Sequence, residues 1–126
     1  VRRTYRVDMK SLGGEAISGL LVEPVAPGKY PAMIHYMGYG SDVWYPHPSS
    51  DPDRIDFMLC VRNQAFNRLP GEENDWCTRG IGNKEEYYYR GAFADAVRAV
   101  DFVCSREKTD LTKVFAQGES QGGCFP

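Results

Sequence analysis

A Gly-x-Ser-x-Gly sequence close to the end of the chain constrains the fold more than any other feature. It occupies residues 118–122, and the preceding residues Lys113–Gln117 form a short, largely apolar run of strand character. In this context the central serine sits on a sharp turn that lifts its hydroxyl clear of the sheet. We therefore predict that a strand leads directly into an exposed Ser120. Gly118 and Gly122 are expected because crowded backbone leaves no room for a Cβ atom.

Length and charge exclude several classes of protein. The chain has 126 residues, which is enough for one modest domain with a hydrophobic core. Its formal net charge of −2 at pH 7 gives no support to nucleic-acid binding or to attachment to an anionic membrane. No apolar run approaches the roughly 20 residues that a membrane-spanning helix needs. The chain begins at Val1 rather than at a methionine, and no signal peptide is visible in it. A cytoplasmic location and a secreted or periplasmic one therefore both remain open.

The four cysteines do not suggest a metal site. They are widely spaced and include no Cys-x-x-Cys pair, so we predict no zinc and no other cofactor. Cys60 lies in an apolar run and Cys104 on the apolar face of an expected helix. Both are predicted to be buried thiols.

Alternating and continuous apolar patterns predict the strands. Residues Thr4–Lys10 alternate, and Ile17–Glu23 follow after turn residues, which indicates an antiparallel hairpin. Pro31–Met37 and Phe57–Val61 are almost continuously apolar, as expected of central parallel strands that are covered on both faces. Between them, Asp51-Pro52 could start a single helical turn, since an N-cap residue precedes a proline.

One long helix is predicted at Glu85–Arg106, after a polar loop at Arg62–Asn83 that has no periodicity. Apolar residues recur in the helix at helical spacing and should face the sheet. They are Phe93, Ala96, Val97, Val100, Val103 and Cys104. The order of the elements predicts an α/β fold in one unit, residues 1–126, with a mostly parallel sheet and an antiparallel N-terminal hairpin.

Four motifs together resemble a known family. They are Thr78-Arg79-Gly80, Tyr87-Tyr88-Tyr89-Arg90, Asp95-Ala96-Val97-Arg98-Ala99 and Gly118-Glu119-Ser120-Gln121-Gly122-Gly123. From about Tyr30 onward, the chain resembles the acetyl xylan esterase/cephalosporin C deacetylase family (carbohydrate esterase family seven) of the α/β-hydrolase superfamily. Glutamine after the serine separates this pattern from prolyl-peptidase relatives, which usually have tyrosine there. The family carries Arg-Gly-Gln after its fourth strand, where this chain has Arg62-Asn63-Gln64.

The resemblance implies a set of site residues. Ser120 would be the nucleophile, and the backbone N–H groups of Tyr39 and Gln121 would form the oxyanion hole. Arg62 and Gln64 would support the site, together with the two glycines of the turn. The implied substrate is a small acetylated carbohydrate or another ester.

The resemblance also implies that the catalytic triad is incomplete. In this fold an Asp or Glu and then a His follow the serine, but only six residues follow Ser120 here. Both histidines, His35 and His47, precede the serine, and His35 matches the oxyanion loop rather than the base. We therefore expect a truncated α/β-hydrolase fold that ends at the nucleophile elbow, and a chain that is inactive by itself.

Several alternatives remain open at this point. The chain could derive from a general carboxylesterase or a peptidase-like hydrolase, or it could be a non-catalytic fragment or assembly module. An uncovered last strand would favour homo-oligomers. Trp44 and Tyr45 could line a substrate entrance or pack locally, whereas His47 is expected to be a solvated loop residue.

Overall fold

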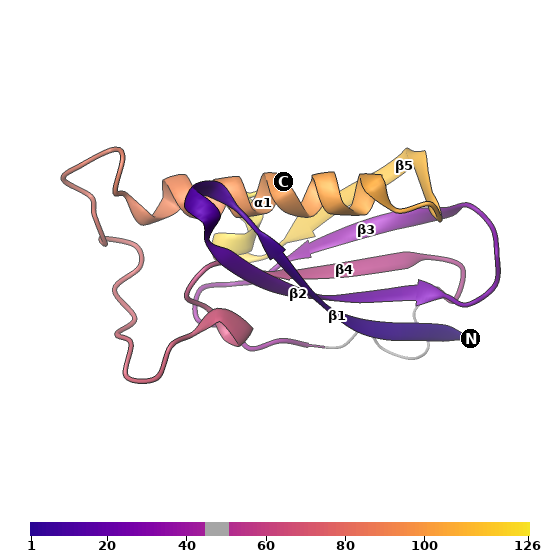
Figure 1. Cartoon of the computed structure of the whole chain (residues 1–126), viewed down its shortest axis with the longest axis horizontal. Helices are drawn as coiled ribbons and strands as arrows, with labels where there is room; N and C mark the ends of the chain where they lie inside the picture. Colours follow the sequence, from indigo (N-terminus) through magenta and orange to yellow (C-terminus); the bar gives the residue numbers. More distant parts are fainter. Residues whose placement is uncertain (45–50) are drawn as a thin grey trace.

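The computed structural model describes residues 1–44 and 51–126. In that part of the chain, five strands form one sheet, and one long helix, α1, lies along it (Figure 1). The strand order is β1-β2-β4-β3-β5. Within the described ranges, no helix is long and apolar enough to cross a bilayer. The expectations for Tyr45 and His47 lie outside the described residues.

The predicted N-terminal hairpin is confirmed. Strands β1 (Arg2–Lys10) and β2 (Ala16–Pro24) pair antiparallel, with Arg2 opposite Pro24. A 3-10 turn, η1 (Leu12–Gly14), connects them. The alternating sequence of β1 fits its position at the edge of the sheet, where one face of the strand meets solvent.

The predicted parallel strands are also confirmed. Strand β3 (Tyr30–Tyr36) lies between β4 (Ile55–Cys60) and β5 (Thr109–Gly118) and is parallel to both. Strand β4 pairs antiparallel with β2 on its other side, so the sheet is mixed. Every residue of β4 is buried, which explains why its sequence is apolar at every position except Asp56.

The predicted helical turn at Asp51-Pro52 is wrong. The Asp51 carboxylate instead accepts a hydrogen bond from the Asp53 backbone N–H at 3.0 Å. This side-chain contact closes a tight turn, and β4 begins directly afterwards at Ile55.

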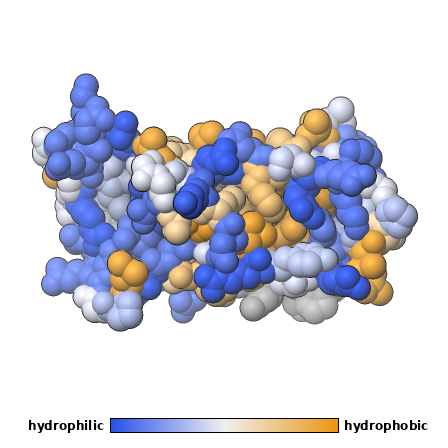
Figure 2. All heavy atoms as spheres, in the orientation of Figure 1, coloured by the Kyte–Doolittle hydropathy of each residue, from blue (hydrophilic) through white to orange (hydrophobic). Residues whose placement is uncertain are grey.

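Helix α1 spans Tyr88–Ser105 and begins three residues later than predicted. Tyr87 has an extended backbone, and the Tyr88 N–H bonds to the Arg79 carbonyl at 2.9 Å, so the preceding segment belongs to the loop. That loop, which contains the 3-10 turn η2 (Ala65–Asn67), presents mostly hydrophilic side chains at the left of Figure 2.

The predicted inward face of α1 is wrong in part. Phe93 and Val97 are 46% and 60% exposed, and Val100 is also exposed. The buried residues of the helix are mostly small: Tyr88, Gly91, Ala92, Asp95, Ala96, Ala99 and Val103. Small side chains allow the helix axis to lie close to the sheet, so the stripe with less apolar bulk faces inward. Cys104 is half-buried, whereas Cys60 is buried as predicted.

The core lies between α1 and the sheet. It contains residues from β2, β3, β4 and the helix, together with the buried Trp76 of the long loop. Strand β5 is an open edge, because it pairs only with β3. Its Leu111 and Phe115 are 65% and 53% exposed, so the expectation of uncovered apolar faces is confirmed.

Candidate active site

The predicted sharp turn is present at the end of β5. The strand ends at Gly118, and a 3-10 turn, η3 (Ser120–Cys124), begins two residues later. Ser120 has a φ of 54°, in the left-handed region that residues other than glycine rarely adopt. Such backbone strain persists only where the surrounding structure enforces it, and it is concentrated at functional sites.

The glycines of this turn are required by crowding, as the sequence predicted. A Cβ atom on Gly118 would overlap the carbonyl of Gly122. A Cβ atom on Gly122 would overlap the carbonyl of Tyr36 at the end of β3. The turn is therefore held tightly between its own backbone and the neighbouring strand.

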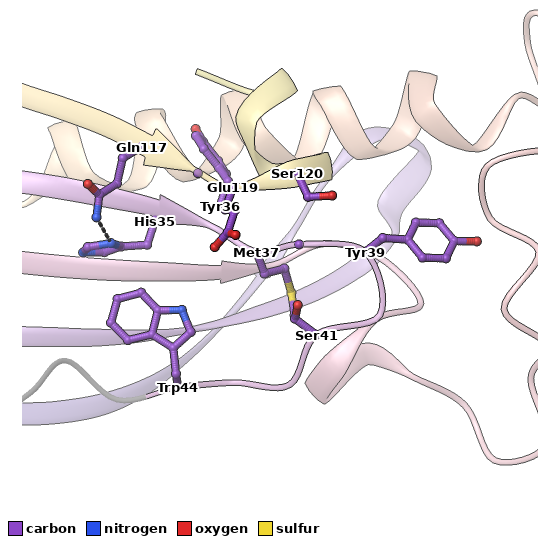
Figure 3. A pocket seen from close by; sticks show the side chains of 11 residues that line it. His35, Tyr36, Met37, Tyr39, Ser41, Trp44, Gln117, Glu119 and Ser120 are labelled. Atoms are coloured by element: carbon purple, nitrogen blue, oxygen red, sulfur yellow. Dashed lines mark hydrogen bonds between the residues drawn. The ribbon is translucent and has the colours of Figure 1, made fainter.

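Ser120 opens onto a cavity of about 660 Å³ at the carboxyl ends of β3 and β5 (Figure 3). Ligand sites of α/β sheets commonly lie at this edge. The lining residues are His35, Tyr36, Met37, Gly38, Tyr39, Ser41, Trp44, Gln117, Gly118, Glu119 and Ser120. The elbow and the loop after β3 thus share one cavity.

Tyr39 belongs to the loop that approaches the elbow. A Cβ atom built on the neighbouring Gly38 would lie 3.9 Å from the Ser120 Cβ and 3.7 Å from the Glu119 carbonyl oxygen. The Tyr39 side chain points away from Ser120, and its hydroxyl donates to the Asn74 carbonyl at 2.9 Å. The role of the Tyr39 N–H in an oxyanion hole remains a prediction.

Gln121, directly after the nucleophile candidate, has a buried side chain. Its Oε1 accepts hydrogen bonds from the Tyr89 hydroxyl at 2.9 Å and from Gln64 Nε2 at 3.2 Å. These bonds hold the Gln121 side chain against helix α1 and the long loop. The proposed use of its backbone N–H also remains a prediction.

Gln64 connects the two segments that are predicted to form the oxyanion hole. Its fully buried amide accepts a hydrogen bond from the Gly40 N–H at 3.0 Å and donates to Gln121. It also donates to the Tyr88 hydroxyl at 2.9 Å. A buried amide with three partners holds the loop after β3 in a fixed relation to the elbow.

Arg62 and Asn63 stand beside this amide. Arg62 forms a bidentate ion pair with the fully buried Asp95 of α1, with distances of 2.7 and 3.0 Å. The guanidinium crosses α1 at Gly91, where a Cβ atom would overlap it. Asn63 has a φ of 63°, in the left-handed region, which asparagine tolerates well.

His35 is on the cavity wall, but both of its ring nitrogens are engaged. Nε2 lies 2.8 Å from the Asp56 carboxylate, and Nδ1 lies 2.9 Å from Gln117 Nε2 (Figure 3 shows the latter bond). Because an amide nitrogen donates, Nδ1 accepts and Nε2 carries the proton toward Asp56. His35 is therefore not placed to take a proton from Ser120.

Asp56 was missed by sequence reasoning. It is fully buried and also pairs with Arg2 and Arg54. Burial raises the pKa of Asp56, but hydrogen bonds from His35 and Arg2 and the charge of Arg54 outweigh it and hold the pKa below its usual value. The available signal was a single aspartate within the apolar run of β4.

Comparisons with known proteins agree with these features. The chain matches the acetyl xylan esterase (AXE1) family over residues 1–126. Acetyl esterase Axe7A of Xylanibacter ruminicola is 28% identical over 139 residues, which cover 96% of this chain and 31% of that protein.

Solved structures show the same fold. An acetyl xylan esterase from a Paenibacillus species has a TM-score of 0.86 and 31% identity, over 98% of this chain and 43% of its own. Acetyl xylan esterase 1 from a Thermoanaerobacterium species has a TM-score of 0.84 and 22% identity, over 98% of this chain and 42% of its own. The chain thus spans less than half the length of these relatives, and its mixed sheet with one helix is the corresponding part of an α/β-hydrolase-like fold. The chain belongs to the acetyl xylan esterase family.

Proposed function

We propose that this chain carries the nucleophile of a serine carboxylic-ester hydrolase that removes acetyl groups from small acetylated sugars. The observation that carries the proposal is the strained Ser120, which follows a parallel strand and opens onto a cavity shared with Tyr39. A sharp turn of this kind exposes a serine hydroxyl to a bound ester. The proposed substrate range includes the acetylated side chain of cephalosporin C.

The residues divide the chemistry as follows. The Ser120 Oγ attacks the acetyl carbonyl carbon, and the negative charge that develops on the carbonyl oxygen is accepted by the N–H groups of Tyr39 and Gln121. A pre-positioned donor of this kind contributes roughly 10²–10³ in turnover. Gln64 stabilises the arrangement, because it bonds both the loop of Tyr39 and the side chain of Gln121.

Serine needs a neighbouring base to take its proton. Within residues 1–44 and 51–126, His35 is the sole histidine, and its nitrogens are bound to Asp56 and Gln117. We therefore propose that the 126-residue chain is inactive by itself and that the acid and the base come from residues outside it. Without a base, only the oxyanion hole and substrate binding would accelerate the reaction, by about 10³–10⁴-fold over the rate in water. The retained rate would therefore be small.

A second candidate is an assembly role. The open edge of β5 and the exposed Leu111 and Phe115 favour pairing with another chain, and a homo-oligomer is the simplest form of such pairing. A general carboxylesterase and a peptidase-like hydrolase would use the same serine, so the choice of substrate distinguishes them.

The test compares the isolated chain with the protein encoded by its complete reading frame. If that frame supplies an Asp and a His after Ser120, the complete protein should release acetate from acetylated xylose, and Ser120→Ala should abolish the release. The isolated chain should hydrolyse p-nitrophenyl acetate no faster than its own Ser120→Ala variant. A robust rate in the isolated chain that disappears in Ser120→Ala would refute the missing base, and His35 and His47 would then be the residues to mutate.

A further inference from the structure

The Thr78-Arg79-Gly80 motif takes no part in the chemistry proposed above, yet its arginine is extensively bonded. The Arg79 guanidinium donates to the Glu72 carboxylate at 2.7 Å and, through two nitrogens, to the Asp75 carboxylate. It also donates to the Glu73 carbonyl at 3.3 Å. A single exposed ion pair contributes little to stability, but a guanidinium fork that joins several groups fixes their relative positions.

The backbone of this motif is anchored to the start of α1. The Arg79 carbonyl accepts a hydrogen bond from the N–H of Tyr88, the first residue of the helix, at 2.9 Å. A Cβ atom on Gly80 would overlap the Glu86 carbonyl, so the chain is tightly packed where it approaches the helix. Arg79 therefore connects a rigid element to residues 72–75 of the long loop.

Residues 74–77 of the same loop hold the side chain of Tyr39. The Tyr39 hydroxyl donates to the Asn74 carbonyl at 2.9 Å and accepts from the Cys77 N–H at 3.5 Å. The Tyr39 ring packs against the buried Trp76 indole, with ring centroids 5.1 Å apart. Because the ring and the hydroxyl are both held, the backbone that carries them is restricted as well.

Glu72 connects this anchor to the second support of the loop after β3. Its Oε1 accepts from Arg79 Nη1 and from Asn63 Nδ2, both at 2.7 Å. Asn63 directly precedes Gln64, whose amide binds the Gly40 N–H. One carboxylate thus joins the two segments that hold the loop of the predicted oxyanion hole.

We propose that Arg79 is a positioning residue that sets the place of the Tyr39 N–H in the oxyanion hole. It acts through the Asn74 carbonyl and the Tyr39 hydroxyl, and it is not among the described residues that line the Ser120 cavity. A misplacement of about 1 Å caused by a remote change can cost as much as 10²-fold in rate. This role rests on the proposed function, because the hole matters only if an ester reacts at Ser120.

The test measures p-nitrophenyl acetate hydrolysis by the complete protein and its variants. Arg79→Met removes the charged fork, and Tyr39→Phe removes only the hydroxyl that binds Asn74. Each should lower kcat about tenfold with little change in KM, because the N–H donates to charge that develops only in the transition state. The rate is divided by the amount of serine that a fluorophosphonate can label, so a loss of folded protein does not count.

The double variant distinguishes positioning from an independent structural role. Arg79→Met should lower kcat little further once Tyr39→Phe is present, because the contact through which Arg79 acts is already gone. Arg79→Lys keeps the charge but not the fork, so its kcat should lie between those of the unmodified protein and Arg79→Met. Arg98→Met is the matched control, since it removes an arginine from an exposed ion pair with Asp101, and it should keep the full kcat.

Hydrogen exchange measures the hold on the loop without any reaction. The N–H groups of Gly40 and Ser41 are both hydrogen-bonded, so their exchange rates report local opening of the loop after β3. We expect these amides to exchange several-fold faster in Arg79→Met and at the unmodified rate in Arg98→Met.

The outcomes separate the role of Arg79 from the proposed function. Unchanged kcat in Arg79→Met, losses that multiply in the double variant, or unchanged exchange at Gly40 and Ser41 would each overturn the role of Arg79. Faster exchange in a complete protein that releases no acetate would leave the hold on the loop in place and refute the esterase. Acetate release with unchanged exchange would do the reverse.

Discussion

Replacing Gln64 by glutamate tests whether this side chain is the buried connection between the loop after β3 and the elbow. The amide is fully buried, and its Nε2 donates to the Tyr88 hydroxyl and to Gln121 Oε1. In Gln64→Glu, a carboxylate oxygen would face Gln121 Oε1, which is also an acceptor. The charged form would therefore lose a hydrogen bond in a dry environment, where the nearby Arg62 is already paired with Asp95.

The magnitude follows from the protonation equilibrium. The new carboxyl can escape the penalty by binding a proton, so its pKa in the folded chain rises. The part of the cost that comes from the charge then cannot exceed the interval between pH 7 and the ordinary glutamic acid pKa of about 4.3, which at about 1.36 kcal/mol per pH unit is about 4 kcal/mol. Because the folded pKa is the raised one, this part of the cost is absent below about pH 4.3 and grows as the pH increases.

The assay is urea unfolding followed by tryptophan fluorescence at pH 7 and pH 5, and Trp76 is a suitable probe because it is buried. Asn74→Asp is the matched control, since it also converts an amide into a carboxylate, but on an exposed side chain. We expect a loss of several kcal/mol for Gln64→Glu at pH 7, a much smaller loss at pH 5, and little change in the control at either pH. Equal stability of the two variants at pH 7 would refute the buried role of Gln64.

Two other predictions concern the elbow and the buried aspartate. Gly122→Ala should destabilise the chain by more than about 3 kcal/mol, because the new Cβ atom would overlap the Tyr36 carbonyl. Gly123→Ala should be tolerated, because its Cβ atom would lie 3.4 Å from its nearest neighbour. Urea unfolding measures both losses of stability, and equal losses would contradict the crowding at Gly122. Because the pKa of Asp56 is lowered in the folded chain, its carboxylate stabilises the fold at pH values above its unfolded pKa of about 3.9. This stabilisation is lost as the pH falls through the folded pKa. Unfolding measured from pH 6 to pH 3 should therefore show a flatter profile for Asp56→Asn, and identical slopes would count against the assignment.

Local patterns in the sequence determined the elements of the fold. Alternation in β1 and the turn residues after it predicted the hairpin, and the continuous apolar runs in β3 and β4 predicted central strands, because the burial of a strand's two faces is recorded in its own residues. The Gly-x-Ser-x-Gly sequence predicted the turn at Ser120, since the crowded backbone of such a turn demands glycine at positions 118 and 122.

The tertiary structure alone decided which face of α1 points inward. Phe93 and Val97 repeat at helical spacing, as do the small residues Ala92 and Ala96, so the sequence contains two possible inward stripes. The periodicity of a sequence shows which residues share one face of a helix, but not how close the helix lies to the sheet. The close approach of α1 to the sheet, with the Arg62 guanidinium crossing Gly91, selects the small side chains.

The polar connections of the site were likewise decided by the tertiary structure. Gln64 and Gln121 are 57 positions apart in the sequence, and His35 and Gln117 are 82 apart, yet each pair is in hydrogen-bond contact. No local sequence pattern predicts such a contact, because the contact depends on the order of the strands in the sheet. The sequence thus located Ser120, the proposed nucleophile, whereas the fold alone brought Trp44 and Glu119 to its cavity and the Gln64 amide to the loop after β3.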